Sequence, residues 1–310
     1  MQRALRRGRR KFLGMAVATG AAMILDRRPG TARPSPLHAK SVPSSGEKLP
    51  VIGLGSWITF NVGDDPVARD GCADVMRSFF DAGGRLIDSS PMYGSSQAVI
   101  GYGIEKLEER LEVFSADKVW ISSGARGRAQ IEQSRQNWGI RRFDLVQVHN
   151  LLSWPEHLPT LLAMKAADQL RYVGITTSEG RRHRDIERLM REQPLDFVQV
   201  TYNILDREVE DRILPLARDR GIGVIVNRPF REGALIRKIA RHPLPGFAAE
   251  MDCANWAQFI LKFIVSHPSV TCAIPATTNV AHVRENMGAA RGRLPDESMR
   301  RRMIAHVEAL

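Results

Sequence analysis

The chain has 310 residues, of which 43% are hydrophobic and 25% charged, a composition that suits a globular protein with a sizeable core and excludes a disordered chain. That length fits one complete α/β barrel with a short extension. The formal charge of +11 would suit a nucleic-acid binder, but residues 1–39 hold nine Lys/Arg and one Asp, so residues 40–310 carry 36 basic against 33 acidic side chains, or +3. Because this part has no basic stripe interleaved with aromatic residues, no nucleic-acid partner is expected.

The first 39 residues resemble a twin-arginine export signal followed by a linker. Arg9-Arg10-Lys11 precedes a mildly apolar run at 15–25, which is too short to span a bilayer core that needs about 20 helical residues. We therefore expect residues 40–310 to form one barrel without a stable membrane anchor, exported through the twin-arginine machinery to the periplasm or otherwise outside the cytoplasm. A Pro/Ser/Gly-rich linker is expected over 29–45, with cleavage after Ala39, and a disordered basic tail is the alternative.

Cysteine and histidine spacing gives no sign of a disulfide framework or of a metal site. The three cysteines, Cys72, Cys253 and Cys272, are few and scattered, and we expect them to be buried apolar side chains. No HxH, HExxH or CxxC motif occurs, so no metal ligand set is expected.

Along the chain, short apolar runs alternate with segments whose apolar residues recur every three or four positions. The runs predict eight buried strands at 50–54, 85–87, 119–122, 145–149, 172–175, 197–201, 223–226 and 271–275. The periodic segments predict helices, among them 67–82, 97–111, 158–167, 184–191, 208–220, 256–265 and 280–290. Connections of this length return parallel, so a closed (β/α)8 TIM barrel, as a single domain, is the predicted α/β fold. The runner-up, an open doubly wound sheet, lacks the G-x-G-x-x-G turn of its dinucleotide site.

Polar residues fall at the C-terminal ends of the predicted strands, where barrels of this kind place their reactive groups. Asp88 follows the second predicted strand and Tyr93 lies in the next loop, while His149 ends the fourth strand and Gln199 lies in the sixth. Singly, such residues are commonly turn, core or packing side chains. Together, the D-x-x-x-x-Y-G spacing and the apolar strand that ends in histidine predict a catalytic cluster.

Several segments carry a more specific pattern: 53–57 (GLGSW), 87–94 (IDSSPMYG), 144–150 (DLVQVHN), 172–176 (YVGIT), 197–199 (FVQ), and Ile274-Pro275 followed by Glu285-Asn286. With these, the chain resembles an aldo-keto reductase from about residue 49 to 303. The resemblance implies NAD(P)H-dependent reduction of an aldehyde or ketone to an alcohol, or the reverse, without a metal. It makes Tyr93 the general acid, has His149 orient the carbonyl, and has Asp88 anchor the network electrostatically.

The resemblance also implies a cofactor, NADP, with NAD as the alternative. Gln199, with Thr176 and Thr177, would hold the nicotinamide carboxamide. Barrels often bind phosphate at the loops after strands seven and eight, here residues 227–230 and 276–279. The further cofactor contacts expected in and after these loops are Asn227, Arg228, Thr277, Thr278 and Asn286.

Other residues modify this expectation. Ala276 and His282 stand where many relatives have the Lys and Arg that grip the adenosine 2′-phosphate, which weakens the preference for NADP. The threonines at 277 and 278 could equally be helix caps. The substrate is expected to be a small carbonyl compound or alcohol, with Trp57, Trp154 and Phe230 as candidate apolar walls of its pocket.

The third predicted strand lacks the lysine that relatives place at its end beside the tyrosine. Gly124 falls at that position, and Lys118 begins the predicted strand, about 17 Å away across five extended residues. Arg126 or Arg128 would supply only a fixed positive charge, because arginine does not readily give up its proton. The sequence therefore predicts an impaired reductase. A non-catalytic nicotinamide-nucleotide-binding barrel is the second hypothesis, and a barrel hydrolase or lyase, without an acid pair or metal cluster, is a weaker third.

Overall fold

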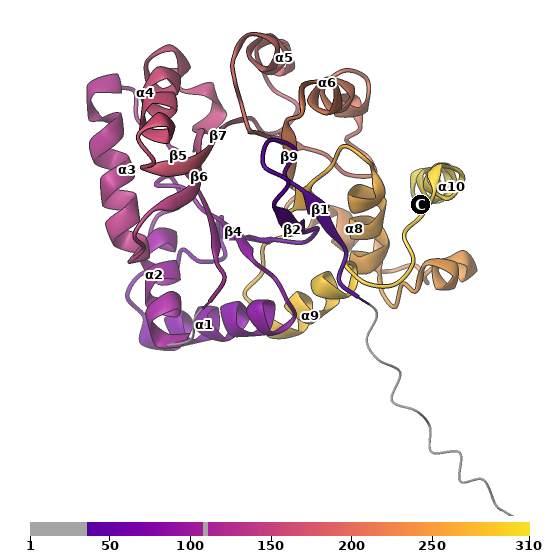
Figure 1. Cartoon of the computed structure of the whole chain (residues 1–310). Coiled ribbons are helices and arrows are strands. Elements are labelled where there is room, and N and C mark those ends of the chain that lie inside the picture. Colours follow the sequence, from indigo (N-terminus) through magenta and orange to yellow (C-terminus); the bar gives the residue numbers. More distant parts are fainter. Residues whose placement is uncertain (1–35, 108–110) are drawn as a thin grey trace, which may run out of the picture. The chain divides into compact units, whose positions relative to one another are not determined.

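The chain folds into a closed barrel of parallel strands. In the computed structural model, which describes residues 36–107 and 111–310, the strands pair in chain order from β3 to β10 (Figure 1). Parallel bridges from Ile52 to Ala273 and from Gly55 to Ala276 join the first strand to the last. A Cβ atom on Gly55 would lie 2.8 Å from the carbonyl oxygen of Ile274, so this close approach requires glycine. The closure confirms the predicted (β/α)8 barrel over an open sheet. The strands are β3 (Leu54–Gly55), β4 (Leu86–Asp88), β5 (Phe114–Val119), β6 (Phe143–Val148), β7 (Leu170–Thr176), β8 (Phe197–Thr201), β9 (Gly223–Asn227) and β10 (Cys272–Ala273).

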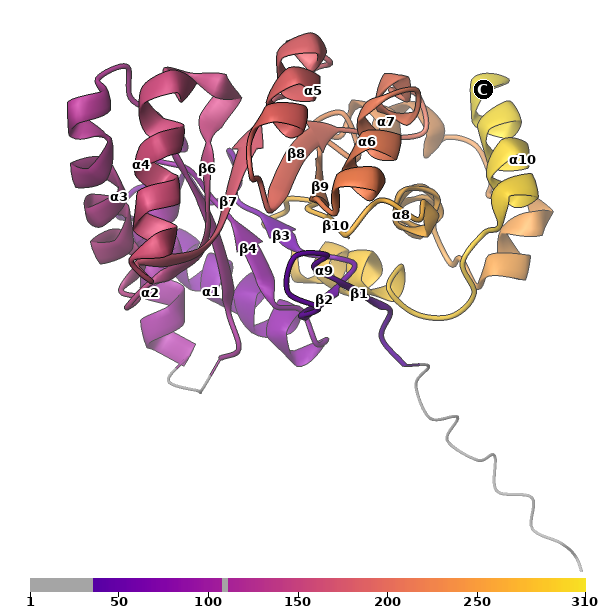
Figure 2. The same cartoon turned by 45° about the horizontal axis from the view of Figure 1, so that its top comes forward.

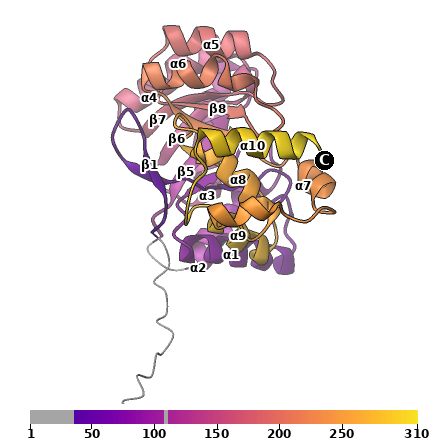
Figure 3. The same ribbon diagram turned by 90° about the vertical axis from the view of Figure 1, so that its right-hand side faces the viewer.

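Helices cover the outside of the barrel (Figure 2). They are α1 (Pro66–Asp81), α2 (Ser96–Leu107), α3 (Gly124–Trp138), α4 (Trp154–Ala166), α5 (His183–Glu192), α6 (Ile213–Arg220), α7 (Ala234–Ile239), α8 (Trp256–Ser266), α9 (Val280–Gly288) and α10 (Glu297–Glu308). Helix α3 was not among the predicted helices because its sequence is strongly polar and it buries few residues, Gly127, Ile131, Ser134 and Trp138. Helix α10 packs on α8, where Arg300 donates to Ser266 Oγ at 3.1 Å (Figure 3). No helix in the described ranges is long and apolar enough to cross a bilayer.

The predicted export signal falls on residues 1–35, outside the described residues, whereas part of the predicted linker belongs to the barrel. Strands β1 (Ala39–Ser41) and β2 (Lys48–Pro50) form an antiparallel hairpin. The backbone N–H of His38 donates to the carbonyl oxygen of Ala290 at 2.7 Å, and His38 Nε2 contacts that of Gly292 at 2.6 Å. The prediction of a linker through residue 45 is therefore wrong, because long-range contacts fix a segment whose composition is typical of a loop.

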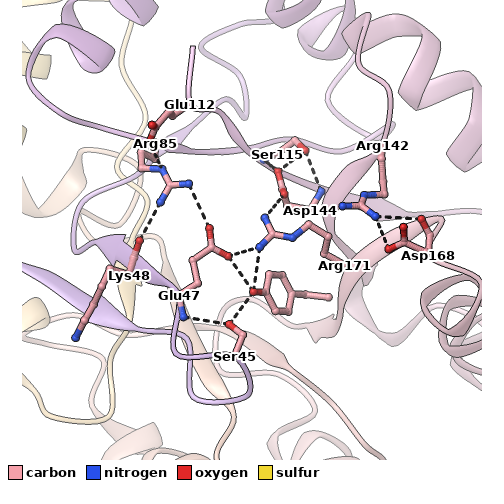
Figure 4. Close-up of polar contacts among 11 residues, drawn as sticks. Ser45, Glu47, Lys48, Arg85, Glu112, Ser115, Arg142, Asp144, Asp168 and Arg171 are labelled. Atoms are coloured by element: carbon pink, nitrogen blue, oxygen red, sulfur yellow. Dashed lines mark hydrogen bonds and ion pairs between the residues drawn. The ribbon is translucent and has the colours of Figure 1, made fainter. Parts of the chain in front are cut away.

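The hairpin loop is tied to the N-terminal ends of the barrel strands by an ionic network (Figure 4). Glu47 forms ion pairs with Arg171 at 2.5 Å and Arg85 at 3.2 Å. The Tyr172 hydroxyl lies 2.9 Å from Glu47 Oε2 and 2.7 Å from Ser45 Oγ. Although burial acts to raise it, the hydrogen bonds from Tyr172 and Arg171 lower the pKa of Glu47. The carboxylate therefore stays ionised and holds the hairpin in place.

Removing the residues that lead into the hairpin is expected to destabilise the barrel. A chain that begins at Lys40 loses the two His38 contacts above and the hydrogen bond from Val51 N to His38 O at 3.1 Å. Relative to a chain that begins at Pro36, it should unfold at a lower urea concentration. The loss of three hydrogen bonds should lower the free energy of unfolding by about 2–4 kcal/mol. Both chains lack the leader, so equal midpoints would contradict the assigned contacts.

Side chains alternate along the strands between the barrel interior and the layer of helices. In β5, Phe114 and Ala116 belong to the interior cluster and Val119 to the cluster beneath the helices. Phe114, Tyr172 and Phe197 fill the N-terminal half of the interior, with ring centroids 5.6 to 6.1 Å apart. This aromatic packing leaves the polar inward-facing residues at the C-terminal end of the barrel.

Candidate active site

A cavity of about 570 Å³ opens at the C-terminal ends of the strands, where the sequence predicted the site. Ten of the predicted residues line it: Asp88, Tyr93, His149, Thr176, Thr177, Gln199, Asn227, Arg228, Thr277 and Asn286. Thr278 is exposed and lies outside the lining, so its predicted cofactor contact is not supported. Trp57 and Phe230 line the cavity as predicted, whereas Trp154 does not and instead packs beneath the Arg188 guanidinium, which lies 5.3 Å from its ring centroid.

At the floor of the cavity lies a buried ion pair that the sequence analysis missed. Lys118 Nζ donates to Asp88 Oδ2 at 2.6 Å and to the carbonyl oxygen of Ser89 at 2.7 Å. The side chains of Lys118 and Asp88 are 0% and 2% exposed, so the pair is shielded from solvent. The prediction that Lys118 lies at the opposite end of the barrel is wrong, and a lysine stands beside Asp88 and Tyr93.

The error came from the position of the third barrel strand. Strand β5 ends at Val119 instead of beginning there, which places Lys118 near its C-terminal end and, by alternation from Ala116, inside the barrel. Gly124, assigned to the lysine position, is the first residue of α3, where its N–H donates to Glu156 Oε2 at 2.8 Å. The arginines at 126 and 128 lie in that helix and are not needed as substitutes.

Tyr93 lies next to this ion pair. The Lys118 ammonium is 5.0 Å from the centroid of the Tyr93 ring. Burial raises the pKa of the Tyr93 phenol, and the Lys118 charge opposes that rise. Burial also acts to lower the pKa of Lys118, but Asp88 and Tyr93 outweigh it and the pKa is raised. The lysine is therefore a charged group that favours release of the phenol proton.

His149 forms the opposite side of the cluster, at the end of β6. Its ring is nearly perpendicular to that of Tyr93, with centroids 5.7 Å apart. Burial and the Lys118 charge lower the pKa of His149 to about 2, so the imidazole is neutral. Ser90 Oγ accepts from the Met92 N–H at 3.2 Å and lies 2.8 Å from His149 Nδ1. If the Ser90 hydroxyl donates to Nδ1, the ring proton lies on Nε2; the same distance also fits an Nδ1–H that donates to Ser90 Oγ.

Amide side chains extend the polar floor away from Tyr93. Gln199 Nε2 donates to Asp88 Oδ1 at 2.8 Å, which connects β8 to β4 across the barrel. Asn227 Nδ2 donates to the carbonyl oxygen of Thr177 at 2.9 Å and lies 3.5 Å from Gln199 Oε1. Thr176 Oγ1 accepts from the N–H of Asn150 at 3.2 Å. These groups form a rigid strip of donors and acceptors along one wall of the cavity.

The predicted phosphate-binding loops flank the other end of the cavity. Arg228 forms an ion pair with Glu179 at 3.1 Å and another with Glu232, so its charge is already partnered. Thr277 Oγ1 accepts from the N–H of Asn279 at 3.0 Å and lies 3.3 Å from His282 Nδ1. Thr277 is therefore both a turn residue and part of the lining. The sequence offered no signal for Glu179 and Glu232, because loop residues gain partners only in the folded chain.

No cysteine is among the residues that line this cavity, and the described part of the chain offers no cluster of metal ligands. Cys72 and Cys272 are buried, Cys253 is partly buried, and all three are unpaired. Within residues 36–107 and 111–310, no group of three or more His, Cys, Asp or Glu side chains could hold a metal ion.

Comparison with known proteins gives one consistent family. The family model for the aldo/keto reductase family matches residues 51–305. The chain is 23% identical over 256 residues to methylglyoxal reductase YeaE of Escherichia coli strain K12, covering 81% of this chain and 89% of that protein. It is 28% identical over 226 residues to the NADH-specific methylglyoxal reductase of the same organism, and the match covers 64% of this chain and 68% of that protein. An aldo-keto reductase from Klebsiella pneumoniae, solved in complex with NADPH, has the same fold, with a TM-score of 0.71 at 21% identity over 88% of this chain and 95% of that one.

Proposed function

The chain belongs to the aldo/keto reductase family, which makes it an NAD(P)-dependent oxidoreductase, and from this premise we propose that the cluster beneath the cavity reduces a small carbonyl compound to an alcohol. The observation that carries this proposal is the Asp88–Lys118 ion pair next to Tyr93. A phenol is a weak acid near neutral pH, with an ordinary pKa near 10. A buried cation beside it makes proton release easier, as general-acid catalysis requires.

In the proposed reaction, the Tyr93 hydroxyl protonates the carbonyl oxygen while the carbonyl carbon gains a hydride. Lys118 stabilises the resulting phenolate, and Asp88 and the Ser89 carbonyl hold the ammonium in place. Neutral His149 donates from Nε2 to the carbonyl oxygen and orients it. The phenolate regains its proton from solvent after the alcohol leaves. When bound, a reduced nicotinamide would supply the hydride.

The residues of the cavity fit such a cofactor. Gln199 and Asn227 provide amide groups suited to a carboxamide. Arg228 could bind a diphosphate only by exchanging its ion pairs with Glu179 and Glu232 for phosphate oxygens. Asn286 and Thr277 also line the cavity and add polar groups that could contact the nucleotide. A relative specific for NADH and a fold neighbour in complex with NADPH support both cofactors, while Ala276 and His282 leave the 2′-phosphate without its usual lysine and arginine.

The non-catalytic barrel is the second hypothesis, and it loses its main support. It rested on the absence of a lysine near the tyrosine, whereas Lys118 lies 5.0 Å from the Tyr93 ring centroid. The same contact removes the reason to expect an impaired reductase. The two relatives named as methylglyoxal reductases support a small aldehyde as substrate, and Trp57 and Phe230 offer apolar walls for it.

We also propose that the protein is exported by the twin-arginine route. The supporting observations are Arg9-Arg10 and the short apolar run at 15–25, which precede a domain that closes around a cofactor-sized cavity. Because Ala39 is the first residue of β1, cleavage after it would divide the hairpin. We therefore place any cleavage before residue 36. Fractionation of cells that produce the native chain and an Arg9→Lys, Arg10→Lys variant tests export, and equal distribution of the two would contradict it.

A titration tests the proposed function directly. The full-length chain is mixed with NADH and with NADPH while tryptophan fluorescence is followed, and a panel of small aldehydes is then offered while nicotinamide absorbance is followed. We expect binding of at least one nucleotide and turnover of several aldehydes. Binding without turnover at any pH would favour the non-catalytic barrel, and no binding at all would contradict both hypotheses.

A further inference from the structure

Asp117 is a buried carboxyl group that adjoins the active site and takes no part in the proposed reaction steps. It precedes Lys118 in β5, so its side chain lies on the opposite face of the strand, beneath the helices. Asp117 is 1% exposed. Its hydrogen-bond partners come from α2, from α3 and from the strand itself. A fully buried carboxyl group without a direct cationic partner is costly, and such groups are uncommon unless they have a function.

The contacts of Asp117 favour its ionised form. Oδ1 accepts from the backbone N–H of Lys118 at 2.6 Å and from Gln97 Nε2 at 3.1 Å. Oδ2 accepts from Gln97 Nε2 at 2.9 Å and from Trp138 Nε1 at 2.6 Å. All four contacts come from N–H donors, which stabilise a carboxylate and offer no acceptor to a carboxylic acid proton. Burial opposes them and raises the pKa of Asp117 to about 7.

The charged groups that act on Asp117 lie across the strand, in the active site. Lys118 lies on the same strand, Asp88 on the neighbouring strand β4, and Tyr93 in the loop after β4. The side chains that contact Asp117 from α2 and α3, Gln97 and Trp138, carry no charge. The Lys118 ammonium is therefore balanced by a second carboxylate behind the strand as well as by Asp88. The charge of Asp117 raises the pKa of both Tyr93 and Lys118.

We propose that Asp117 is a positioning residue of this active site: it holds the backbone of Lys118 and adds a second negative charge near the Asp88–Lys118 pair, so that Tyr93 holds its proton more tightly. This inference rests on the proposed function of Tyr93. As pH rises through neutrality, Asp117 becomes ionised and opposes the ionisation of Tyr93. The phenol then stays protonated to a higher pH, so carbonyl reduction should persist further into the alkaline range before alcohol oxidation takes over.

The test is the pH profile of kcat/KM for reduction and for oxidation in the full-length chain. In Asp117→Asn, the alkaline limb of the reduction profile should move to lower pH by about 0.5–1 unit, since a nearby charge has been removed. Oxidation, which needs the phenolate, should gain activity over the same range. Trp138→Phe removes one N–H donor but keeps the carboxyl group, which is still ionised at the alkaline limb, so the limb of this variant should stay near its native position.

A matched control separates charge from loss of stability. Asp196 is another buried carboxyl group, held by Lys165 Nζ at 2.6 Å and the Val173 N–H at 2.9 Å, just before β8 at the other end of the barrel. Asp196→Asn should lower the midpoint of urea unfolding and leave the alkaline limb of the reduction profile in place. An unmoved limb in folded Asp117→Asn would overturn the inference. If that variant does not fold, Asp117→Ser removes the same charge with a smaller polar side chain, and an unmoved limb in that variant would overturn the inference.

A spectroscopic measurement keeps this inference apart from the proposed function. The ionisation of Tyr93 is followed by tyrosinate absorbance, as the difference between each chain and its Tyr93→Phe counterpart. A lower ionisation pH in Asp117→Asn would support the inference even if no aldehyde is turned over. Turnover by the native chain combined with an unchanged ionisation pH would overturn it and leave the reductase intact.

Discussion

Replacing Tyr93 with phenylalanine is expected to lower kcat for carbonyl reduction by about 10²–10⁴-fold, the usual contribution of a positioned general acid. The ring keeps its packing against His149, whose centroid lies 5.7 Å away, so the fold and the cavity should be preserved. Only the proton donor to the carbonyl oxygen is lost. Steady-state kinetics with NADH and NADPH measure the effect, and nucleotide affinity measured by fluorescence should stay within a few-fold of the native value.

The matched control for this change is Tyr102→Phe. Tyr102 lies on α2, where its hydroxyl donates to Asp70 away from the cavity. This variant loses one partly exposed hydroxyl group and should keep its kcat. Native turnover in Tyr93→Phe would contradict the assignment of the acid. Equal loss in both variants would attribute the effect to stability instead of chemistry.

Replacing Lys118 with methionine is expected to reduce both activity and stability. Methionine preserves most of the side-chain volume but leaves Asp88 as an unpaired charge whose remaining side-chain partner is Gln199. Breaking a buried ion pair in this way costs about 3–5 kcal/mol. Without the ammonium, the pKa of Tyr93 rises further, so kcat for reduction should fall by about 10²-fold or more. Urea unfolding and steady-state kinetics measure the two effects.

The two effects can be separated by a second substitution. In Asp88→Asn with Lys118→Met the uncompensated charge is gone, so much of the lost stability should return while activity stays low. Lys165→Met is the control, because it breaks the ion pair between Lys165 and buried Asp196 outside the cavity. It should destabilise the barrel and leave kcat unchanged. Recovery of activity in the double variant would show that Lys118 has no role beyond holding the fold.

Local patterns in the sequence were sufficient to find most of the fold and three of the four members of the reactive cluster. The alternation of apolar runs with helical periodicity predicted the eight-stranded barrel that the strand order confirms. The spacing of Asp88 and Tyr93, and the apolar strand before His149, predicted residues that line one cavity. Such patterns can be read from the sequence because the spacing of residues along one strand or loop determines which side chains point in the same direction, independently of the rest of the fold.

The fourth member of the cluster was missed for a physical reason. Strand β5 reads FSADKV, with a buried lysine facing the interior and a buried aspartate facing the helices, so it has no apolar run. Its position depends on pairing with its neighbours, in which Lys118 lies opposite Gln147. The hairpin from Ala39 to Pro50 was misread in the same way, since its contacts are with residues far along the chain.

Amino-acid order alone was enough to establish the barrel and the tyrosine, histidine and aspartate of its rim, because each is marked by the spacing of residues close together in the chain. Only the tertiary structure shows which partners the charged side chains have. Whether Lys118 meets Asp88, and whether Asp117 lies behind them, depends on which strands are adjacent and in what register. Electrostatic pairing acts through space over a few ångströms, and that distance is not encoded by separation along the chain.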